Sequence, residues 1–475
     1  MYIVRGIELF VKDHNSIKMV PASKVQRDQS ISLISQLLVY SPAHGYYRCM
    51  KIQIHPDVLE RQRYTCNCCG AGCRSFLVGV RPEEREAILK LENWSERLQR
   101  ANEKLFVLHP AAGRLGYGLA KRADGRCVFL DGENLCIIHK LHGLKAKPLA
   151  CQLYPFVLTP AAGKLHVGLR FDCPAVIRNE GACLSTYERE LKQLCKDLIT
   201  PEIESLPTPA VYAKHRIDDD KFLALNEAFL KIVDSTALDL VDRLHWLYGF
   251  AEHLKKVKWD KVPDDDFADL LSMLQGGVLA EVQRQKRQRI PVTGKPRKML
   301  GQIFFLLCQP TTVITGVKEG IFRKIKNRLA LHRNAKQLSM AAGSLPKIQP
   351  DWPDCDLSEL EASFGPWPAD VQKTLTRYLT CRIGGLGYCG HNFYQYSMLE
   401  GIQSLLLGMV TIGWVMRIRA VKAGRKTLAR EDAYESVMTI DGNLGYSSAL
   451  GFGPSRWRLR YLSEHLTHLL NWYCT

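Results

Sequence analysis

Eight cysteines between residues 66 and 173 fall into two groups. The first group is tight and the second is spaced along the following segments: Cys66, Cys68, Cys69 and Cys73, then Cys127, Cys136, Cys151 and Cys173. Thiolates are the softest protein ligands, and they select zinc, cuprous copper or iron–sulfur clusters. Because short gaps let one loop present several sulfurs to one centre, the two groups predict a metal site assembled from two halves.

Cysteine is concentrated around these groups, since residues 66–195 hold ten of the sixteen cysteines. A disulfide framework would also use many cysteines, but it is typical of small secreted domains behind a signal peptide. In residues 1–13, charged side chains break any apolar run before it reaches the length of a signal-peptide core. We therefore expect a protein of the reducing cytoplasm, where thiolates favour metal.

The chain has 475 residues, more than one hydrophobic core usually serves, so we expect two or three structural units. Its composition, 46% hydrophobic and 24% charged, is that of a folded protein and not of a disordered one. The longest apolar run, residues 405–416, lies in a helix-like stretch that starts near Phe393 and also carries Glu400 and Gln403. It is too short to span a bilayer and predicts a buried core helix.

The N-terminal third divides into an extension and a cysteine-rich unit. Residues 1–49 show little periodicity, and a strand-like segment begins at Met50, which is a candidate for the native start. Intact mass of the natively expressed protein tests that hypothesis. Residues 50–200 form the predicted metal-binding domain, with β-like pieces at 75–80 and 127–130. Its clearest helix is 81–91, with Pro82 and acidic residues in the first turn.

The remainder of the chain is predicted to be helical. Amphipathic periodicity predicts helices over residues 187–199, 221–233, 238–257, 267–285, 321–336, 371–382 and 456–473. Turns rich in Pro and Trp at 351–355 and 364–368 divide this half near residue 345, giving regions 201–345 and 346–475. The expected fold class is α+β, mostly α, with a small cysteine-rich domain followed by a helical region.

Positive charge is concentrated in one stretch. Of the net charge of +17, residues 281–336 contribute +12, from fourteen Lys and Arg against two Glu. A basic stretch is typical of nucleic-acid binders. We interpret it as a solvated linker and helix face, because no recognition motif or aromatic stacking platform accompanies the charge.

Four segments carry the cysteines, and their motifs are distinctive. They read YTCNCCGAGCR at 64–74, CVFLDGENLCIIH at 127–139, and KPLACQLYPF at 147–156 followed by RFDCP at 170–174. Glycines in the first segment permit the tight, partly left-handed backbone that such a loop needs. Together the segments resemble the cysteine-cluster family of zinc- or iron-chelating proteins, which also contains the flagellin lysine N-methylases. The resemblance covers residues 66–173, about a quarter of the chain.

The resemblance implies metal binding by all eight cysteines, with Cys68 the last in rank. There is one departure, because the family's paired third cysteine falls on Gly72 while Cys68 appears upstream. Either Cys68 replaces the missing ligand or the loop supplies only three sulfurs. Four thiolates satisfy both zinc and iron–sulfur centres. The methylase branch is linked with a [4Fe-4S] cluster, and the resemblance favours that cofactor. Eight sulfurs also suffice for two centres.

Residues for catalysis are not evident. The resemblance alone implies methyl transfer from S-adenosylmethionine to a protein lysine. Gly385, Gly387 and Gly390 match G-x-G-x-x-G, but they follow a predicted helix rather than a strand, so we interpret them as a helix C-cap. Asp131 and Asp172 lie beside the proposed ligands and are expected in turns or in supporting contacts.

Three residues near the motifs have unremarkable expected roles. His139 is interpreted as a packed or surface histidine, and Cys183 and Cys195 as ordinary buried cysteines. The sequence therefore predicts a cytoplasmic, bacterial metal-binding protein with a [4Fe-4S] cluster or zinc and methylase-like activity on a protein substrate. The alternatives are a non-catalytic structural or redox-sensing metal module and, last, a nucleic-acid binder.

Overall fold

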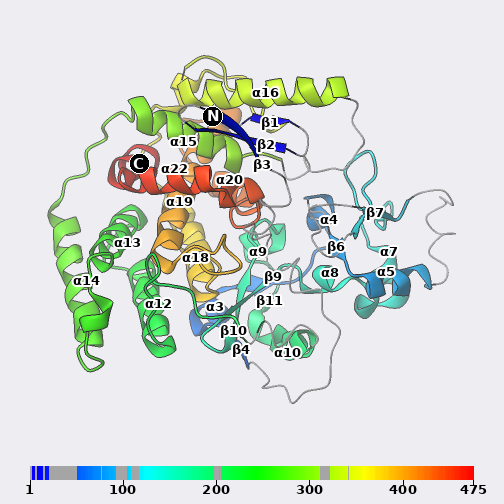
Figure 1. Ribbon diagram of the computed structural model, residues 1–475, viewed down its shortest axis with the longest axis horizontal. Coiled ribbons are helices and arrows are strands. Elements are labelled where there is room, and N and C mark those ends of the chain that lie inside the picture. Colours follow the sequence, from blue (N-terminus) through cyan, green and yellow to red (C-terminus); the bar gives the residue numbers. More distant parts are fainter. Residues whose placement is uncertain are drawn as a thin grey trace.

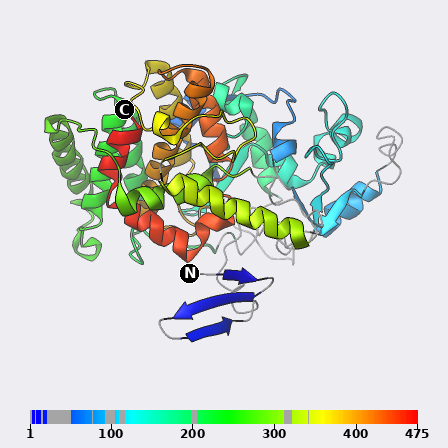
Figure 2. The ribbon, with the colours of Figure 1, turned by 90° about the horizontal axis from the view of Figure 1, so that it is seen from above.

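The computed structural model describes the backbone of residues 3–5, 8–13, 16–20, 51–75, 78–91, 104–108, 117–196, 203, 205–310, 321–340 and 342–475. Helices dominate, and the strands are short, which confirms the predicted α+β, mostly α, class. Figure 1 shows the cysteine-rich part on one side and the helical part on the other. The first described strands, Ile3–Arg5, Glu8–Asp13 and Ser16–Val20 (β1 to β3), form an antiparallel meander beside the helical part (Figure 2). Met50 lies outside the described residues.

The cysteine-rich part contains three small sheets and short helices. Its strands are β4 (Lys51–Gln53), β5 (Arg63–Tyr64), β6 (Gly79–Val80), β7 (Phe106–Leu108), β8 (Tyr117–Leu119), β9 (Phe156–Ala161), β10 (Lys164–Leu169) and β11 (Ala182–Cys183). The sheet orders are β4-β10-β9, β6-β8-β7 and β11-β5, and all pairs are antiparallel except β4 with β10. The helices are α3 (Pro56–Arg61), α4 (Ala71–Ser75), α5 (Pro82–Leu89), α7 (Ile137–His142), α8 (Leu149–Leu153), α9 (Pro174–Arg178) and α10 (Glu188–Lys196).

Two predicted strands of this part differ from the structure. The sequence predicts an extended segment over 75–80, of which residues 76 and 77 lie outside the described residues. Ala71–Ser75 is helical, and Gly79–Val80 is a strand. Residues 127–130 form a turn, with isolated bridges to Lys121 at one end and Cys136 at the other. The apolar side chains of 128–130 are buried without a strand because they fill the small core around the cysteines.

The predicted ranges 221–233, 238–257, 267–285, 321–336 and 371–382 each fall on one helix of the helical part. The helices that the structure describes in this part differ widely in length. They are α12 (Asp219–Asp234), α13 (Leu240–Leu254), α14 (Phe267–Arg284), α15 (Gly294–Leu307), α16 (Ile321–Met340), α17 (Leu357–Leu360), α18 (Ala369–Gly384), α19 (Met398–Lys422), α20 (Arg430–Asp441), α21 (Ser448–Gly451), α22 (Gly453–Ser463) and α23 (Leu466–Tyr473). The helix predicted over 456–473 breaks between α22 and α23. Helix α15 was not predicted, because its start lies in the basic stretch that we interpreted as a linker.

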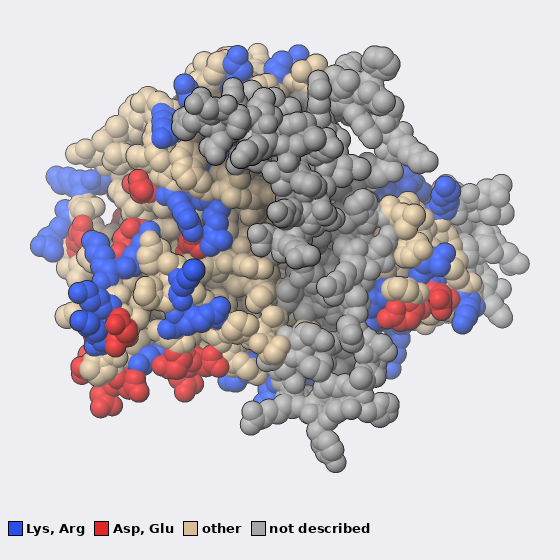
Figure 3. Space-filling view, in the orientation of Figure 1, with Lys and Arg blue, Asp and Glu red and all other residues tan. Residues whose placement is uncertain are grey.

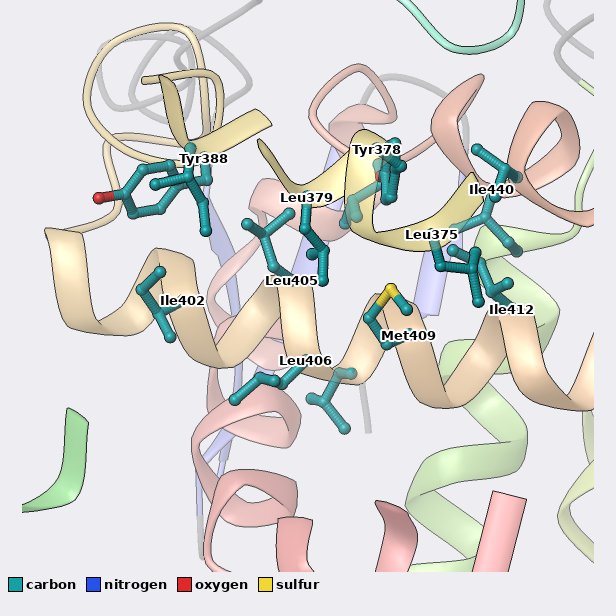
Figure 4. Packing of buried hydrophobic residues seen from close by; sticks show 14 of the residues in the cluster. Leu375, Tyr378, Leu379, Tyr388, Ile402, Leu405, Leu406, Met409, Ile412 and Ile440 are labelled. Atoms are coloured by element: carbon teal, nitrogen blue, oxygen red, sulfur yellow. The ribbon is translucent and has the colours of Figure 1, made fainter. Parts of the chain in front are cut away.

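Helix α19 is the centre of the helical part. It begins with a capping box of Ser397 and Glu400, and nearly every side chain along it is buried. Figure 4 shows Leu405, Met409 and Ile412 of α19 packed against α18 and α20. Within the described chain, α19 is the one helix long and apolar enough to cross a membrane, and 94% of that window is buried inside the protein. The prediction of a buried core helix is confirmed.

The buried apolar residues form two clusters of unequal size. The large cluster begins at Ile54, includes Leu149 and Leu153 of α8 together with β9 and β10, and continues through the helical part to α23. The small cluster lies in the cysteine-rich part and includes Val80, Ile88, Leu119, Phe129 and Ile137. Gly168 on β10 lies very close to Gly385 at the end of α18, since a Cβ added to Gly385 would lie 2.5 Å from the Gly168 Cα. This contact joins the second half of the cysteine-rich part to α18.

Candidate metal centre

Four cysteines gather at the small apolar cluster. Cys73 comes from α4, Cys127 from the turn after β8, Cys136 from the N-cap of α7 and Cys151 from α8. Cys127 is buried, and the other three are half-buried against the same cluster. The structure therefore brings one sulfur of the first group together with three of the second.

Backbone hydrogen bonds hold three of these segments in place. The Cys127 amide donates to the Cys73 carbonyl at 3.1 Å, and the Ile137 amide donates to the Phe129 carbonyl at 2.9 Å. Between Cys127 and Cys136, the Asp131 carboxylate accepts from the amides of residues 133 and 135, each at 2.9 Å. This closes the loop that positions both cysteines. Asp131 thus has the turn role expected from the sequence.

Electrostatics link the four thiols. Burial raises the pKa of the Cys127 thiol to about 12 and that of Cys151 well above its ordinary value. Burial also raises the pKa of Cys73, and negative charge on Cys136 raises it further. The pKa of Cys151 is raised in turn by charge on Cys73, Cys127 and Cys136. Buried thiols of this kind stay protonated near neutral pH, so a metal must displace protons to bind them.

Two lysines lie beside this group of sulfurs. Lys121 donates from Nζ to the Cys73 carbonyl at 2.5 Å, and although burial lowers its pKa, charge on Cys127, Cys73 and Cys151 acts to raise it. The positive charge of Lys147 partly opposes the rise in pKa that burial causes at both Cys73 and Cys151. Four thiolates around a divalent metal carry a net charge of about −2, and two ammonium groups offset it. Lys147 is part of the Lys-Pro segment, but nothing in the sequence distinguished Lys121.

The other four cysteines lie elsewhere. Cys66, Cys68 and Cys69 are exposed, and Cys173 is buried at the N-cap of α9. Burial raises the pKa of Cys173 to about 11, and charge on Asp172 and Cys69 adds to the effect. Burial and charge on Cys66 and Cys69 raise the pKa of Cys68. Charge on Cys66 also raises the pKa of Cys73, so the exposed cysteines interact both with Cys173 and with the set of Cys73, Cys127, Cys136 and Cys151.

Gly72 explains the departure from the family pattern. A Cβ added at Gly72 would lie 2.9 Å from the Tyr154 ring, so that ring fills the space beside the position where the family has a cysteine. The left-handed backbone expected in this loop occurs at Gly70, with φ of +67°, and at Cys68, with φ of +54°. The sequence predicts no role for Tyr154 in packing beside the first cysteine group, although Tyr154 lies within the KPLACQLYPF segment.

Asp172 belongs to a buried polar network between the two parts of the molecule. Its carboxylate accepts from Arg170 at 2.5 Å and from the Tyr154 hydroxyl at 3.3 Å. The Arg170 guanidinium lies 3.7 Å from the centre of the Tyr446 ring. The Phe171 amide donates to Asp441 of α20 at 2.7 Å. Asp172 thus has the supporting role expected, and it holds the segment before Cys173 against the helical part.

The remaining sequence predictions are resolved as follows. His139 is exposed on α7, and Cys195 is buried on α10 while Cys183 is half-buried on β11. The glycines at 385–390 follow helix α18, as expected for a helix C-cap. All cysteines in the described chain are free. Over the same residues, no group of three or more His, Cys, Asp or Glu side chains is arranged to hold a metal ion, so the ligand set stays a prediction.

Residues 65–196 match the model of the CxxCxxCC family, described as "Putative zinc- or iron-chelating domain". The match contains both groups of cysteines and all the segments on which the resemblance rests, which confirms that resemblance. No curated protein and no solved structure matches the chain. The family match supports metal binding by this part of the molecule.

Proposed function

Taking residues 65–196 as a zinc- or iron-chelating domain of the CxxCxxCC family, we propose that the protein binds a metal centre through Cys73, Cys127, Cys136 and Cys151. The observation that carries the proposal is that these four cysteines lie against one small apolar cluster, where a backbone hydrogen bond joins Cys127 to Cys73. Four thiolates suit an iron–sulfur cluster or zinc. The resemblance to the methylase branch favours the [4Fe-4S] cluster.

The donor set fits such a centre chemically. The four thiols come from four separate segments, and lysines rather than carboxylates lie beside them. A bound centre would hold these segments together and supply redox or Lewis-acid chemistry. The residues of this chain bring the sulfurs together, neutralise their charge through Lys121 and Lys147, and exclude water with the apolar side chains around Phe129.

Cys66, Cys68, Cys69 and Cys173 are proposed as a separate group, which would ligate a second centre. The interactions of Cys68 with Cys66 and Cys69, and of Cys173 with Cys69, support this grouping. Cys68 is exposed, which argues against the alternative that it completes the set of four cysteines at the small cluster. Methyl transfer to a protein lysine is the activity that the family resemblance implies. Binding of S-adenosylmethionine to the loaded protein is the assay to follow the metal analysis.

The test is anaerobic purification followed by metal analysis, acid-labile sulfide and a visible spectrum on one sample. We expect iron with matching sulfide and broad visible absorption. Zinc in a colourless sample would mean that the four thiolates hold a zinc ion instead of an iron–sulfur cluster.

Variants then identify the ligands. Cys127→Ser and Cys151→Ser should each lose the centre, while Cys195→Ser, buried outside both groups, should retain full metal content. Cys69→Ser should lose only the metal of the second group. Full metal occupancy in both Cys127→Ser and Cys151→Ser would refute the proposed ligand set.

A further inference from the structure

Helix α22 and the turn after it carry a line of adjoining rings, in which Trp457 is exposed while Tyr461 and His465 are half-buried. Trp457 is 51% exposed, and its ring stacks on Tyr461, with centroids 5.9 Å apart and an interplanar angle of 20°. The Tyr461 ring lies 5.1 Å from His465. Phe452, at the start of the helix, is 44% exposed. We call Trp457, Tyr461 and His465 the aromatic row. The exposed ring of Trp457 leaves surface available to a partner at one end of this row.

The basic stretch supplies cations to this row. The Lys295 ammonium lies 4.5 Å from the Tyr461 ring centroid and 5.4 Å from that of Trp457. Lys298 follows one turn later on α15 and is exposed. Gln302, one turn further, accepts a hydrogen bond from Arg458 of α22. Helix α15 therefore presents its cationic start along the side of the aromatic row.

Much of the other charge in the stretch has structural partners. Arg287 pairs with Asp239 and Asp242, at 2.5 and 2.6 Å. Arg289 lies 3.8 Å over the Trp472 ring, and Arg297 is buried, donating to the Leu338 carbonyl. In Figure 3, Lys and Arg are interspersed with Asp and Glu over the described residues of the face shown. The positive net charge is therefore not spread evenly over this surface.

Lys295 and Lys298 differ from these arginines, since neither pairs with a carboxylate of the described residues. Glu400, which contacts α22, is buried and already bound by Arg456 and Arg460 at 2.6 and 2.7 Å. The exposed Glu464 interacts with Tyr248 of α13. Among the residues that the structure describes, the patch therefore combines the exposed Trp457 ring with two lysines that have no carboxylate partner.

We propose that the aromatic row with Lys295 and Lys298 binds single-stranded nucleic acid. Bases stack on Trp457 and Tyr461, and the backbone phosphates lie along the lysines, the combination that sequence-tolerant single-strand binders use. A duplex would not expose base faces to these rings. This surface is independent of the metal centre, and it overturns our interpretation that the basic stretch has no aromatic platform.

The test uses the full-length protein and a fluorescein-labelled oligothymidine, with binding followed by anisotropy at several salt concentrations. Trp457→Ala should weaken binding about tenfold, which is the size of effect that loss of one base–aromatic stack produces. Trp457→Phe, which keeps an aromatic ring, should bind within about threefold of the unaltered protein. Trp457 is the one exposed tryptophan of the described residues, so stacked bases should also quench tryptophan emission, and Trp457→Phe should lose that quenching.

The lysine contribution is separated by charge-matched variants. Lys295→Gln should reduce the slope of log affinity against log salt by about 0.7, the value for one phosphate contact on a single strand. Lys90→Gln, an exposed change in the cysteine-rich part, should leave the slope unaltered. Equal affinity of Trp457→Ala and the unaltered protein would overturn the proposal. So would no binding of the oligonucleotide, including the case in which phosphatidylserine vesicles bind instead.

Discussion

The two parts of the molecule obtain their cohesion in different ways. In the helical part, the 25 residues of α19 lie inside a continuous apolar core that extends from Ile54 to α23. In the cysteine-rich part, the elements that carry Cys73, Cys127, Cys136 and Cys151 are helices of five or six residues and a turn beside a small separate cluster. Helix α8 also contributes Leu149 and Leu153 to the large cluster. Helices that short are not stable alone. The comparison indicates that burial maintains the first region and that ligands must maintain the second.

Removal of the metal should separate the two regions most clearly. Chelation under anaerobic conditions should unfold the segments around Cys73, Cys127, Cys136 and Cys151, because their small core cannot replace the cohesion of the ligands. Helices α18 to α20 should stay folded. Hydrogen exchange read by mass spectrometry checks this, and equal loss of protection in both regions would contradict the comparison.

A cavity in the helical core should have the opposite effect. Leu406, on α19, is fully buried, so Leu406→Ala should lower the free energy of unfolding by about 2–5 kcal/mol. Thermal unfolding measures the loss, and metal content should stay unchanged. The exposed Leu329→Ala on α16 is the matched control, with an expected effect within about 0.5 kcal/mol.

The capping carboxylate of α19 should make the helical part sensitive to acid. Burial raises the pKa of Glu400, but hydrogen bonds and charge from Arg456 and Arg460 outweigh it and bring the pKa to about 2, from an ordinary 4.5. A lowered pKa stabilises the fold above the ordinary value, and this contribution is lost as pH falls from 4.5 toward 2.

Glu400→Gln should therefore cost about 1–3 kcal/mol at neutral pH and remove part of the acid dependence of stability. Denaturant unfolding at a series of pH values measures both. Glu431→Gln, an exposed carboxylate on α20, is the control. If Glu400→Gln keeps the full acid dependence, the role assigned to this ion pair is wrong.

A smaller change should test the packing beside the first cysteine group. Gly72→Ala places a Cβ against the Tyr154 ring and should cost about 1–3 kcal/mol through overpacking, with lower metal retention. Gly132→Ala has open space around its Cβ and should be nearly neutral. Metal content and unfolding of the two variants are compared, and equal behaviour would show that Tyr154 adjusts freely.

Most of the helical part could be predicted because local signals and burial agree. Periodicity placed α13 and α14 within a few residues, and Asp218 and Asp239 cap α12 and α13 as short polar residues do. Helix α15 was missed because its first residues, Gly294 to Lys298, are basic and include a proline, although the following apolar residues are buried. The split between α22 and α23 follows packing rather than a local signal.

The sequence by itself determined the chemistry of the cysteine-rich part, since soft ligands in distinctive motifs are local properties of the chain. It also determined that a helical region follows and that residues 405–416 are core. Only the tertiary structure decided which sulfurs meet, because Cys73 and Cys151 are far apart along the chain and a loop alone does not fix their separation. The same holds for Lys121 beside the thiols, for Tyr154 against Gly72, and for Lys295 beside Trp457, since long-range contacts follow from packing that no local pattern encodes.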